Sequence, residues 1–425
     1  MELTVKNLWN KNFSLLIIGQ IMSIFGNMIL SWALPFYILD ITNSPAIFGL
    51  VLSVPYISLI IMSPIGGIMA DRLKKQRIMF WLDLITTIII VLYMVANSLI
   101  AAAVPLVIVK LLTLNAIQGM YMPVVQSAVP ALVPQDKLIP ANSAVTVINS
   151  LSNLIAPAAA GILYGNFGLF PILVISVLCF AITAVMDLLI NIPYKKQSSH
   201  ENVFQMIKDD MSQAVNFAIK EKPLLAKFAV VAFVFSITIA SMLIVGIPVL
   251  VTKNLGMGMD MVGISSSIMM VGGLLGGILA GVLGTRLTIK KVYLPLLFCC
   301  IFVLPMGIIF LFNTSTFLVY VVITTSSAFA LICATICNIQ FFAYVQGETP
   351  SKLIGKVMSI LLIMPFLANA LGQLLFGVLF EQFDEFPWLI IFLAVFLSFL
   401  ITIYTRFIFK NVIISEIKKG DIIYE

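Results

Sequence analysis

Long apolar stretches constrain this chain more than any other feature of its sequence. Twelve runs are each long enough to cross about 30 Å of hydrocarbon at about 1.5 Å per residue. With 61% hydrophobic and 10% charged residues, the chain falls well short of the roughly one-quarter charged residues of a soluble domain. It is therefore predicted to be an all-α integral membrane protein. The predicted spans are 12–39, 46–70, 78–97, 103–127, 141–165, 169–192, 224–252, 261–284, 291–312, 317–345, 354–380 and 387–409.

Basic residues fall on one side of this arrangement. If the N-terminus is cytoplasmic, all of the 24 Lys and Arg residues except Lys110 and Lys253 lie in inner segments. This bias is the positive-inside rule, and an odd number of spans would break it. The sequence thus predicts a multi-pass protein of the cell (inner) membrane with both termini in the cytoplasm. The net charge of +6 then reflects topology and contact with anionic membrane lipids, and no nucleic-acid partner is expected.

Two short motifs occur twice, half a chain apart. The segment GIMADRLKKQR at 67–77 is matched by GVLGTRLTIKK at 281–291, and PQDKLI from Pro134 is matched by PSKLI from Pro350. The offsets, 214 and 216 residues, place the first six spans in register with the last six. Such repeats are one way in which transporters build a central site between two halves. The predicted domains are a six-helix bundle at 1–193, a cytoplasmic linker with an amphipathic helix at 194–223, a second six-helix bundle at 224–410 and a cytoplasmic tail at 411–425.

The 67–77 loop resembles the signature that the major facilitator superfamily carries between its second and third spans, Gly-x-Leu-Ala-Asp-Arg-x-Gly-Arg-Lys. The resemblance covers nearly the whole chain and implies twelve helices in two six-helix bundles related by pseudo-two-fold symmetry. It also implies a gating latch, in which Asp71 accepts hydrogen bonds from a helix N-terminus and Arg72 pairs across the bundle. The alternative is that these charges only anchor the topology. The gating residues are Gly67, Asp71, Arg72, Lys75 and Arg77.

The fifth span carries Ala156, Pro157 and Gly161, which resemble the Gly-Pro-x-x-Gly-Gly element of exporters in this superfamily. Small residues let helices approach, and a proline breaks one backbone hydrogen bond and bends the helix. The chain looks most like the macrolide and multidrug efflux branch, which implies export. It departs from its relatives on the fourth span, where they commonly carry an Arg five residues before the Gly that matches Gly119. This chain has Leu114 there.

Ionisable residues inside the spans are functional candidates, because a charge in hydrocarbon costs several kcal/mol unless it is paired or wet. Asp83, Lys110 and Asp187 lie within predicted spans, and Asp40 lies just beyond the outer end of the first. All four are candidates for ion coupling. For Asp83 the expected role is pairing with the loop around Arg72, where water also reaches, and ion coupling is the alternative. For Lys110 the alternative is a side chain that extends to the outer surface.

Neutral polar residues form stripes at helical spacing on the first and fifth spans. Such stripes line a cavity or bond neighbouring helices, since an amide facing lipid is penalised. Methionine and aromatic residues would suit an apolar or amphipathic substrate, although both are also ordinary residues of membrane cores. The residues expected to line the substrate cavity are Gln20, Asn27, Trp32, Tyr37, Gln118, Tyr121, Asn149, Asn153, Ser236, Asn338, Phe341 and Asn369.

These features predict a secondary active transporter that exports amphipathic compounds or drugs by alternating access with proton coupling. The alternatives are an importer, a lipid or lysolipid facilitator of the same fold, or a transporter without proton coupling. The sequence lacks the Gly-x-x-x-x-Gly-Lys-Ser/Thr motif of ATP-driven proteins, and its single His lies in the linker. Hence no enzyme activity, cofactor or metal site is expected. The expected partners are a small amphipathic molecule, protons and membrane lipids, and the chain is expected to act as a monomer.

Overall fold

The computed structural model describes residues 8–99, 102–192, 211–213, 215–283, 291–350 and 353–421. Nearly all of them are helical, and within these ranges twelve helices are long and apolar enough to cross a membrane. The predicted all-α membrane class and its twelve spans are thus confirmed. By its packing the chain divides into two units, residues 1–200 with 251–267 and residues 201–250 with 268–425.

Unit 1 contains the first six long helices and a short 3-10 turn. Local signals set several of their ends. The side chain of Asn10 accepts the backbone N–H of Phe13, and the side chain of Ser44 accepts that of Ile47, as N-caps do. Gly168, at φ 73°, ends the fifth helix in the left-handed region that glycine tolerates. The elements are α1 Lys11–Thr42, α2 Pro45–Arg72, α3 Lys75–Leu99, α4 Ala103–Leu132, η1 Gln135–Lys137, α5 Leu138–Phe167 and α6 Leu169–Leu189.

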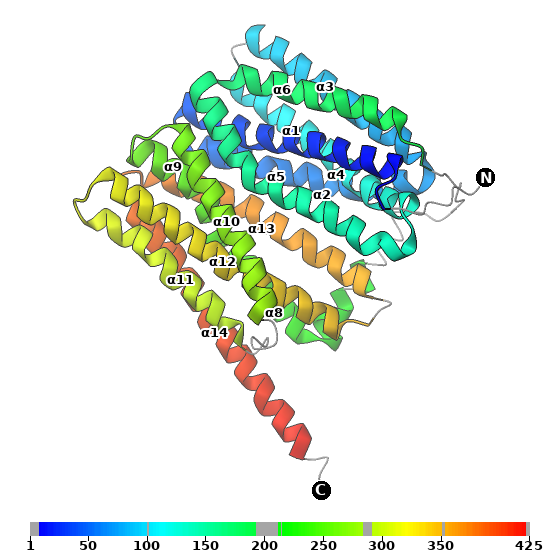
Figure 1. Cartoon of the computed structure of the whole chain (residues 1–425). Coiled ribbons are helices and arrows are strands. Elements are labelled where there is room, and N and C mark those ends of the chain that lie inside the picture. The colour runs from blue at the N-terminus through cyan, green and yellow to red at the C-terminus, as the bar shows by residue number, and fades with distance from the viewer. Residues whose placement is uncertain are drawn as a thin grey trace. The chain divides into compact units, whose positions relative to one another are not determined.

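Within unit 1, α6 packs on α1 and α3, while α2 packs on α4 (Figure 1). The backbones of α2 and α4 approach each other closely at two glycines. A Cβ on Gly66 would lie 2.5 Å from the Cα of Met120, and one on Gly119 would lie 3.0 Å from the carbonyl of Leu59. Glycine at the contact therefore lets the two helices approach as closely as small residues permit.

Unit 2 begins with a span that is irregular along its length. In this span α8 and α9 are separated by the π-helical turn η3, and a second π-helical turn, η4, follows. The hydroxyl of Ser241 donates to the carbonyl of Ser236 at 3.1 Å, across the wider turn. The remaining elements are η2 Phe217–Glu221, α8 Pro223–Phe235, η3 Ser236–Ala240, α9 Ser241–Val249, η4 Leu250–Asn254, α10 Met259–Leu283, α11 Tyr293–Ile308, η6 Ile309–Leu311, α12 Thr316–Glu348, α13 Ile354–Gln382 and α14 Pro387–Asp421. Residues 251–267, which comprise most of η4 and the first turns of α10, belong to unit 1.

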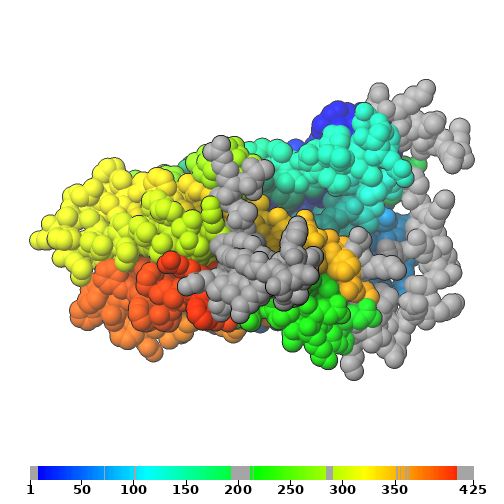
Figure 2. Space-filling view, turned by 90° about the horizontal axis from the view of Figure 1, so that it is seen from below, coloured from blue at the N-terminus to red at the C-terminus, as the bar shows by residue number. Residues whose placement is uncertain are grey.

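Within unit 2, α11 packs on both α12 and α14, and Figure 2 shows their yellow and red surfaces meeting on one face. The turn η3 is held from two sides. Thr238 shares a hydrogen bond with Ser398 of α14, at 2.6 Å between the hydroxyl oxygens. A Cβ on Gly372 of α13 would lie 2.8 Å from the carbonyl oxygen of Ile237 in this turn.

Parts of the predicted linker and loops lie outside the described residues. These are most of the amphipathic helix in 194–223, the larger part of the second loop copy at 281–291, and the end of the tail at 422–425. The described part of the linker, through η2, is helical, and Phe217 is buried against Leu225 and Phe228. Lys222 and Glu348 form an ion pair that joins the start of α8 to the end of α12.

Candidate functional site

Unit 1 encloses a cluster of polar side chains in an otherwise apolar bundle. Asp83 of α3 and Asp187 of α6 are each only 1% exposed. Ser23 of α1 donates to Asp83, with 3.4 Å between Oγ and Oδ1. One turn away, the amide of Gln20 donates to the hydroxyl of Tyr121 of α4, at 3.4 Å. Four helices thus contribute to one buried cluster, because α1, α3, α4 and α6 turn their rare polar residues away from lipid.

The two aspartates interact with each other directly, and we refer to Asp83 and Asp187 as the carboxyl pair. The expected pairing of Asp83 with the loop around Arg72 is wrong, since the contacts of Asp83 are with Asp187, Ser23 and Tyr121. Its position on α3 directs the side chain into the bundle rather than towards the inner surface. Sequence reasoning named both aspartates but did not bring them together.

A small cavity of about 10 Å³, room for about one water molecule, adjoins the carboxyl pair. It brings together three residues that were predicted to line a cavity, Asn27, Gln118 and Tyr121, and it adds Asp83. Sequence reasoning missed Thr86, although its position one turn after Asp83 was a usable signal. It also missed Phe180, for which no local signal exists. The remaining lining residues are Ser23, Leu114 and Ile117.

Leu114 occupies an informative place in this cavity. It is the position at which the family resemblance led us to expect an Arg, and it lines the same space as Asp83. An arginine there would bring a guanidinium beside the carboxyl pair. Leucine brings no charge to this cavity.

Lys110 of α4 is 2% exposed, so its side chain does not extend to the surface. Its ammonium lies 4.1 Å from the centroid of the Tyr93 ring on α3, a cation–π contact. Among the described residues its Nζ has no hydrogen-bond acceptor, and Lys110 does not line the cavity next to the carboxyl pair. A buried, unpaired ammonium of this kind is costly.

Replacing Lys110 by methionine is expected to raise the thermal unfolding temperature of the purified protein. The cation–π contact is worth up to about 2 kcal/mol, whereas an uncompensated buried charge costs several kcal/mol, so its removal dominates. Unfolding in detergent, followed by intrinsic fluorescence, measures the effect. Lys137→Met, at a side chain 43% exposed, serves as the control and should change little. A lower unfolding temperature for Lys110→Met would mean that the ammonium is paired in the folded protein.

The predicted residues near the outer end of α1 contact α5. The hydroxyl of Tyr164 donates to the carboxylate of Asp40 at 2.7 Å, and the ring of Tyr37 meets that of Tyr164 edge-on at 6.3 Å between centroids. Trp32, half-buried, packs on Phe36 at 5.8 Å. Asp40 itself is exposed and is not part of the buried cluster.

The side-chain amides of two asparagines on α5 donate hydrogen bonds to backbone carbonyls of α5 itself. Asn149 donates to the carbonyl of Val145, and Asn153 donates to the carbonyl of Asn149, both within the same helix. In this structure neither amide group donates to a neighbouring helix. Asn153 is exposed, so its lining of a substrate path stays a prediction.

The predicted bend of α5 lies at a close contact with the first turns of α10, all within unit 1. The N–H of Ala158, which follows Pro157 in the chain, donates to the hydroxyl of Ser267 at 2.9 Å. A Cβ on Gly161 would lie 2.4 Å from the carbonyl of Met259 and 2.7 Å from the Cα of Gly263. The third motif residue, Ala156, is fully buried. Sequence reasoning missed Ser267, whose role depends on a helix a hundred residues away.

The predicted gating loop is described except for the side chain of Asp71. Lys75 donates to the carbonyl of Ser127 at 2.8 Å, near the C-terminal end of α4, where a cation is favoured. Arg72 and Arg77 are exposed. A Cβ on Gly67 would meet no atom within 4 Å, so the glycine that α4 requires is Gly66, not the motif glycine. The gating role of the five residues stays a prediction.

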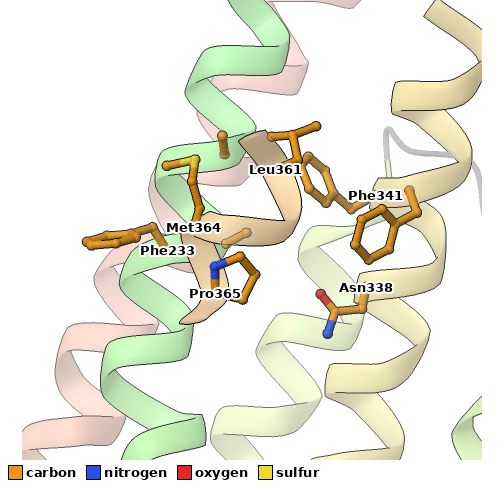
Figure 3. Close-up of a pocket in the computed structure, with 9 residues that line it drawn as sticks. Phe233, Asn338, Phe341, Leu361, Met364 and Pro365 are labelled. Carbon is orange, nitrogen blue, oxygen red and sulfur yellow. The ribbon is translucent and has the colours of Figure 1, made fainter. Parts of the chain in front are cut away.

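A small pocket of about 10 Å³ lies in unit 2 between α8, α12 and α13. Figure 3 shows Phe233 of α8, Asn338 and Phe341 of α12, and Met364 and Pro365 of α13 around it. Asn338 and Phe341 were predicted to line the cavity, and the ring of Phe341 stacks on that of Phe228 at 4.8 Å. The lining is thus aromatic and apolar with one amide. The other lining residues are Ala229, Ala232, Phe342 and Leu361.

The last two predicted cavity residues lie outside this pocket. Ser236 begins the π-helical turn η3, a kind of irregularity that is frequent at functional sites. Asn369 is half-buried on α13, and its side-chain oxygen has no hydrogen-bond donor among the described residues.

Comparison with known proteins adds to this geometry. A family model described as Major Facilitator Superfamily matches residues 16–372. Macrolide efflux protein A of Streptococcus pyogenes is 24% identical over 209 residues, which are 48% of this chain and 52% of the relative. Macrolide efflux protein A of Enterococcus faecalis is 24% identical over 155 residues, 36% of this chain and 48% of the relative. The chain thus spans about half the length of the curated relatives it matches.

Solved structures show the same fold. A bacterial homologue of the human lysosomal transporter Spinster, in an inward-facing and unoccupied conformation, has a TM-score of 0.74 at 14% identity, covering 94% of this chain and 98% of the other. The nucleoside transporter NupG has a TM-score of 0.72 at 16% identity, covering 93% and 99%.

Proposed function

We infer that this chain, which belongs to the major facilitator superfamily, is a proton-driven exporter of amphipathic compounds. As a member of that family it is a multi-pass membrane transporter. The finer proposal is that it sits in the cell membrane with both termini in the cytoplasm, works as a monomer, and moves its substrate outwards by alternating access.

The observation that carries the proposed direction is the similarity to efflux proteins. Two of the relatives are named macrolide efflux protein A. Macrolides are large amphipathic molecules, and export of such compounds fits the exporter-like Pro157 and Gly161 contact on α5. The similarity is 24% over about half of each relative, so the substrate class needs support from the site itself.

The unit 2 pocket supports an amphipathic substrate. Its walls are formed by phenylalanine, methionine, leucine and alanine side chains, and Asn338 provides an amide. Apolar walls with few polar groups are typical of sites for small apolar ligands, and methionine adapts to different shapes. A sugar or phosphate carrier needs several hydrogen-bonding or charged groups in its site, and this pocket offers one.

Transport in oriented membrane vesicles tests the proposal. Inside-out vesicles that contain the protein are energised so that their interior becomes acidic, and uptake of a radiolabelled macrolide and of ethidium is measured. An exporter accumulates the probe in these vesicles, and an uncoupler abolishes the accumulation. Accumulation in right-side-out vesicles instead would identify an importer. Accumulation that survives the uncoupler would rule out proton drive, and movement of a labelled lysolipid alone would favour a lipid facilitator.

A further inference from the structure

We infer that Asp83 and Asp187 bind one shared proton, and that this carboxyl pair takes up and releases the proton that drives export. The second half of this inference rests on the proposed function. The first half does not, because a proton site within the fold is measurable without any substrate.

The carboxyl pair has no compensating cation among the described residues in contact with it. α1 contributes the neutral side chains of Ser23 and Gln20, and α4 contributes Tyr121, the one other titratable group at the pair. α5, which also packs on α6, places no described charge there. Two like charges held close together in a buried site repel each other, and each also loses its hydration. One proton between the carboxyl groups removes the repulsion and one of the two buried charges.

Unsatisfied acceptors at the pair point to the same conclusion. The Oδ2 atoms of both aspartates and the side-chain oxygen of Gln20 are buried, and none has a hydrogen-bond donor in the described structure. Buried polar atoms normally have a partner, so three orphaned acceptors in one cluster require an explanation. A proton carried on one carboxyl group and donated to the other supplies the missing donor for the pair.

The adjoining cavity gives this proton a route. Asp83 lines the cavity, together with Ser23, Gln118 and Tyr121, whereas Asp187 does not. With about 10 Å³ of space and several polar side chains in its walls, the cavity can accommodate about one water molecule. A hydronium ion in the cavity can therefore transfer its proton to Asp83, leaving water behind, and Asp187 then accepts the hydrogen bond. On release the proton passes from Asp83 back to a water molecule in the cavity.

Protonation of the pair bears on how the helices pack. Asp83 belongs to α3 and Asp187 to α6, two helices that pack against each other. With the shared proton the pair attracts, and without it the pair repels, so each proton that enters or leaves changes the force between α3 and α6. The change also reaches α1, because Ser23 of α1 donates a hydrogen bond to Asp83.

Infrared difference spectroscopy of the purified, full-length protein in liposomes tests proton binding directly. The C=O stretch of a protonated buried carboxyl group is expected in the wild type, and it should disappear as the bulk pH is raised. It should be absent from Asp83→Asn and from Asp187→Asn, because the introduced amide donates the hydrogen bond in place of the proton and leaves the other carboxylate ionised. Asp136→Asn, at a loop side chain 70% exposed, serves as the control and should keep the band.

Transport links this site to the proposed function. Gradient-driven accumulation of the radiolabelled macrolide should fall at least about ten-fold in Asp83→Asn and in Asp187→Asn but not in Asp136→Asn, with all variants matched for folded protein. If the wild type moves none of the probes, the proposed function fails, while the infrared band still decides on the proton site.

Three results would overturn the inference. A band that persists in the double variant Asp83→Asn/Asp187→Asn would place the proton elsewhere. A band lost in one single variant but kept in the other would show a site on one residue, without sharing. A folded wild type with no band at any pH at which it stays folded would show that the pair does not hold a proton.

Discussion

Leucine in place of Gly66 is expected to prevent unit 1 from folding. A Cβ at this position would lie 2.5 Å from both the Cα and the carbonyl oxygen of Met120, so the backbone of α4 would have to move. Forcing even single methylenes into a well-packed core costs about 1–3 kcal/mol, and a leucine side chain against backbone exceeds this. Since whole proteins are stable by only about 5–15 kcal/mol, the yield of folded protein should drop sharply.

The neighbouring Gly67 provides the matched control. It belongs to the predicted gating motif, yet a Cβ there would meet no atom within 4 Å. Gly67→Leu should therefore fold at least as well as the wild type, because leucine is a better helix former than glycine by roughly 1 kcal/mol. Size-exclusion chromatography of the two variants as fluorescent fusions measures the difference. Equal yields would show that α2 and α4 do not pack through Gly66.

Tryptophan in place of Ala232 is expected to block transport by filling the unit 2 pocket. Ala232 lines this small pocket together with Phe233 and Met364. An indole there occupies the space offered to the substrate, and it does so without removing the aromatic side chains that stabilise the unit. The efflux rate of ethidium should fall by roughly ten-fold or more, equivalent to about 1.4 kcal/mol in the barrier.

Val230→Trp is the matched control for this substitution. It introduces the same side chain on the same helix two residues earlier, where Val230 is 50% exposed and does not line the pocket. Its efflux should stay close to that of the wild type at equal amounts of folded protein. If Ala232→Trp transports as fast as Val230→Trp, the pocket is not on the substrate path.

The membrane spans were predictable because the thickness of hydrocarbon dictates how long an apolar helix must be. The ends were less predictable. The fourth span was expected to end at 127, but α4 runs to Leu132, and the fifth was expected to begin at 141, but α5 begins at Leu138. Polar residues at a membrane surface do not stop a helix, whose backbone hydrogen bonds continue into water.

The candidate site was predictable as a set of residues but not as a set of contacts. Asp83 and Asp187 were singled out because charges in a membrane are rare, yet their meeting depends on how α3 and α6 are rotated against each other. The rotation depends on packing between segments that are 104 residues apart in the sequence. A local sequence pattern does not encode such packing. The same holds for Lys110, where sequence could not tell a surface-seeking side chain from one covered by Tyr93.

The contact between Gly161 and the first turns of α10 has a consequence for reversibility. Its two surfaces are mostly backbone, since Gly161 and Gly263 face each other without side chains between them. Ordering a long side chain costs up to about 2 kcal/mol, whereas glycine has no side-chain freedom to lose. Forming or breaking a contact of this kind therefore changes little side-chain entropy, and the hydroxyl of Ser267 adds one hydrogen bond to it.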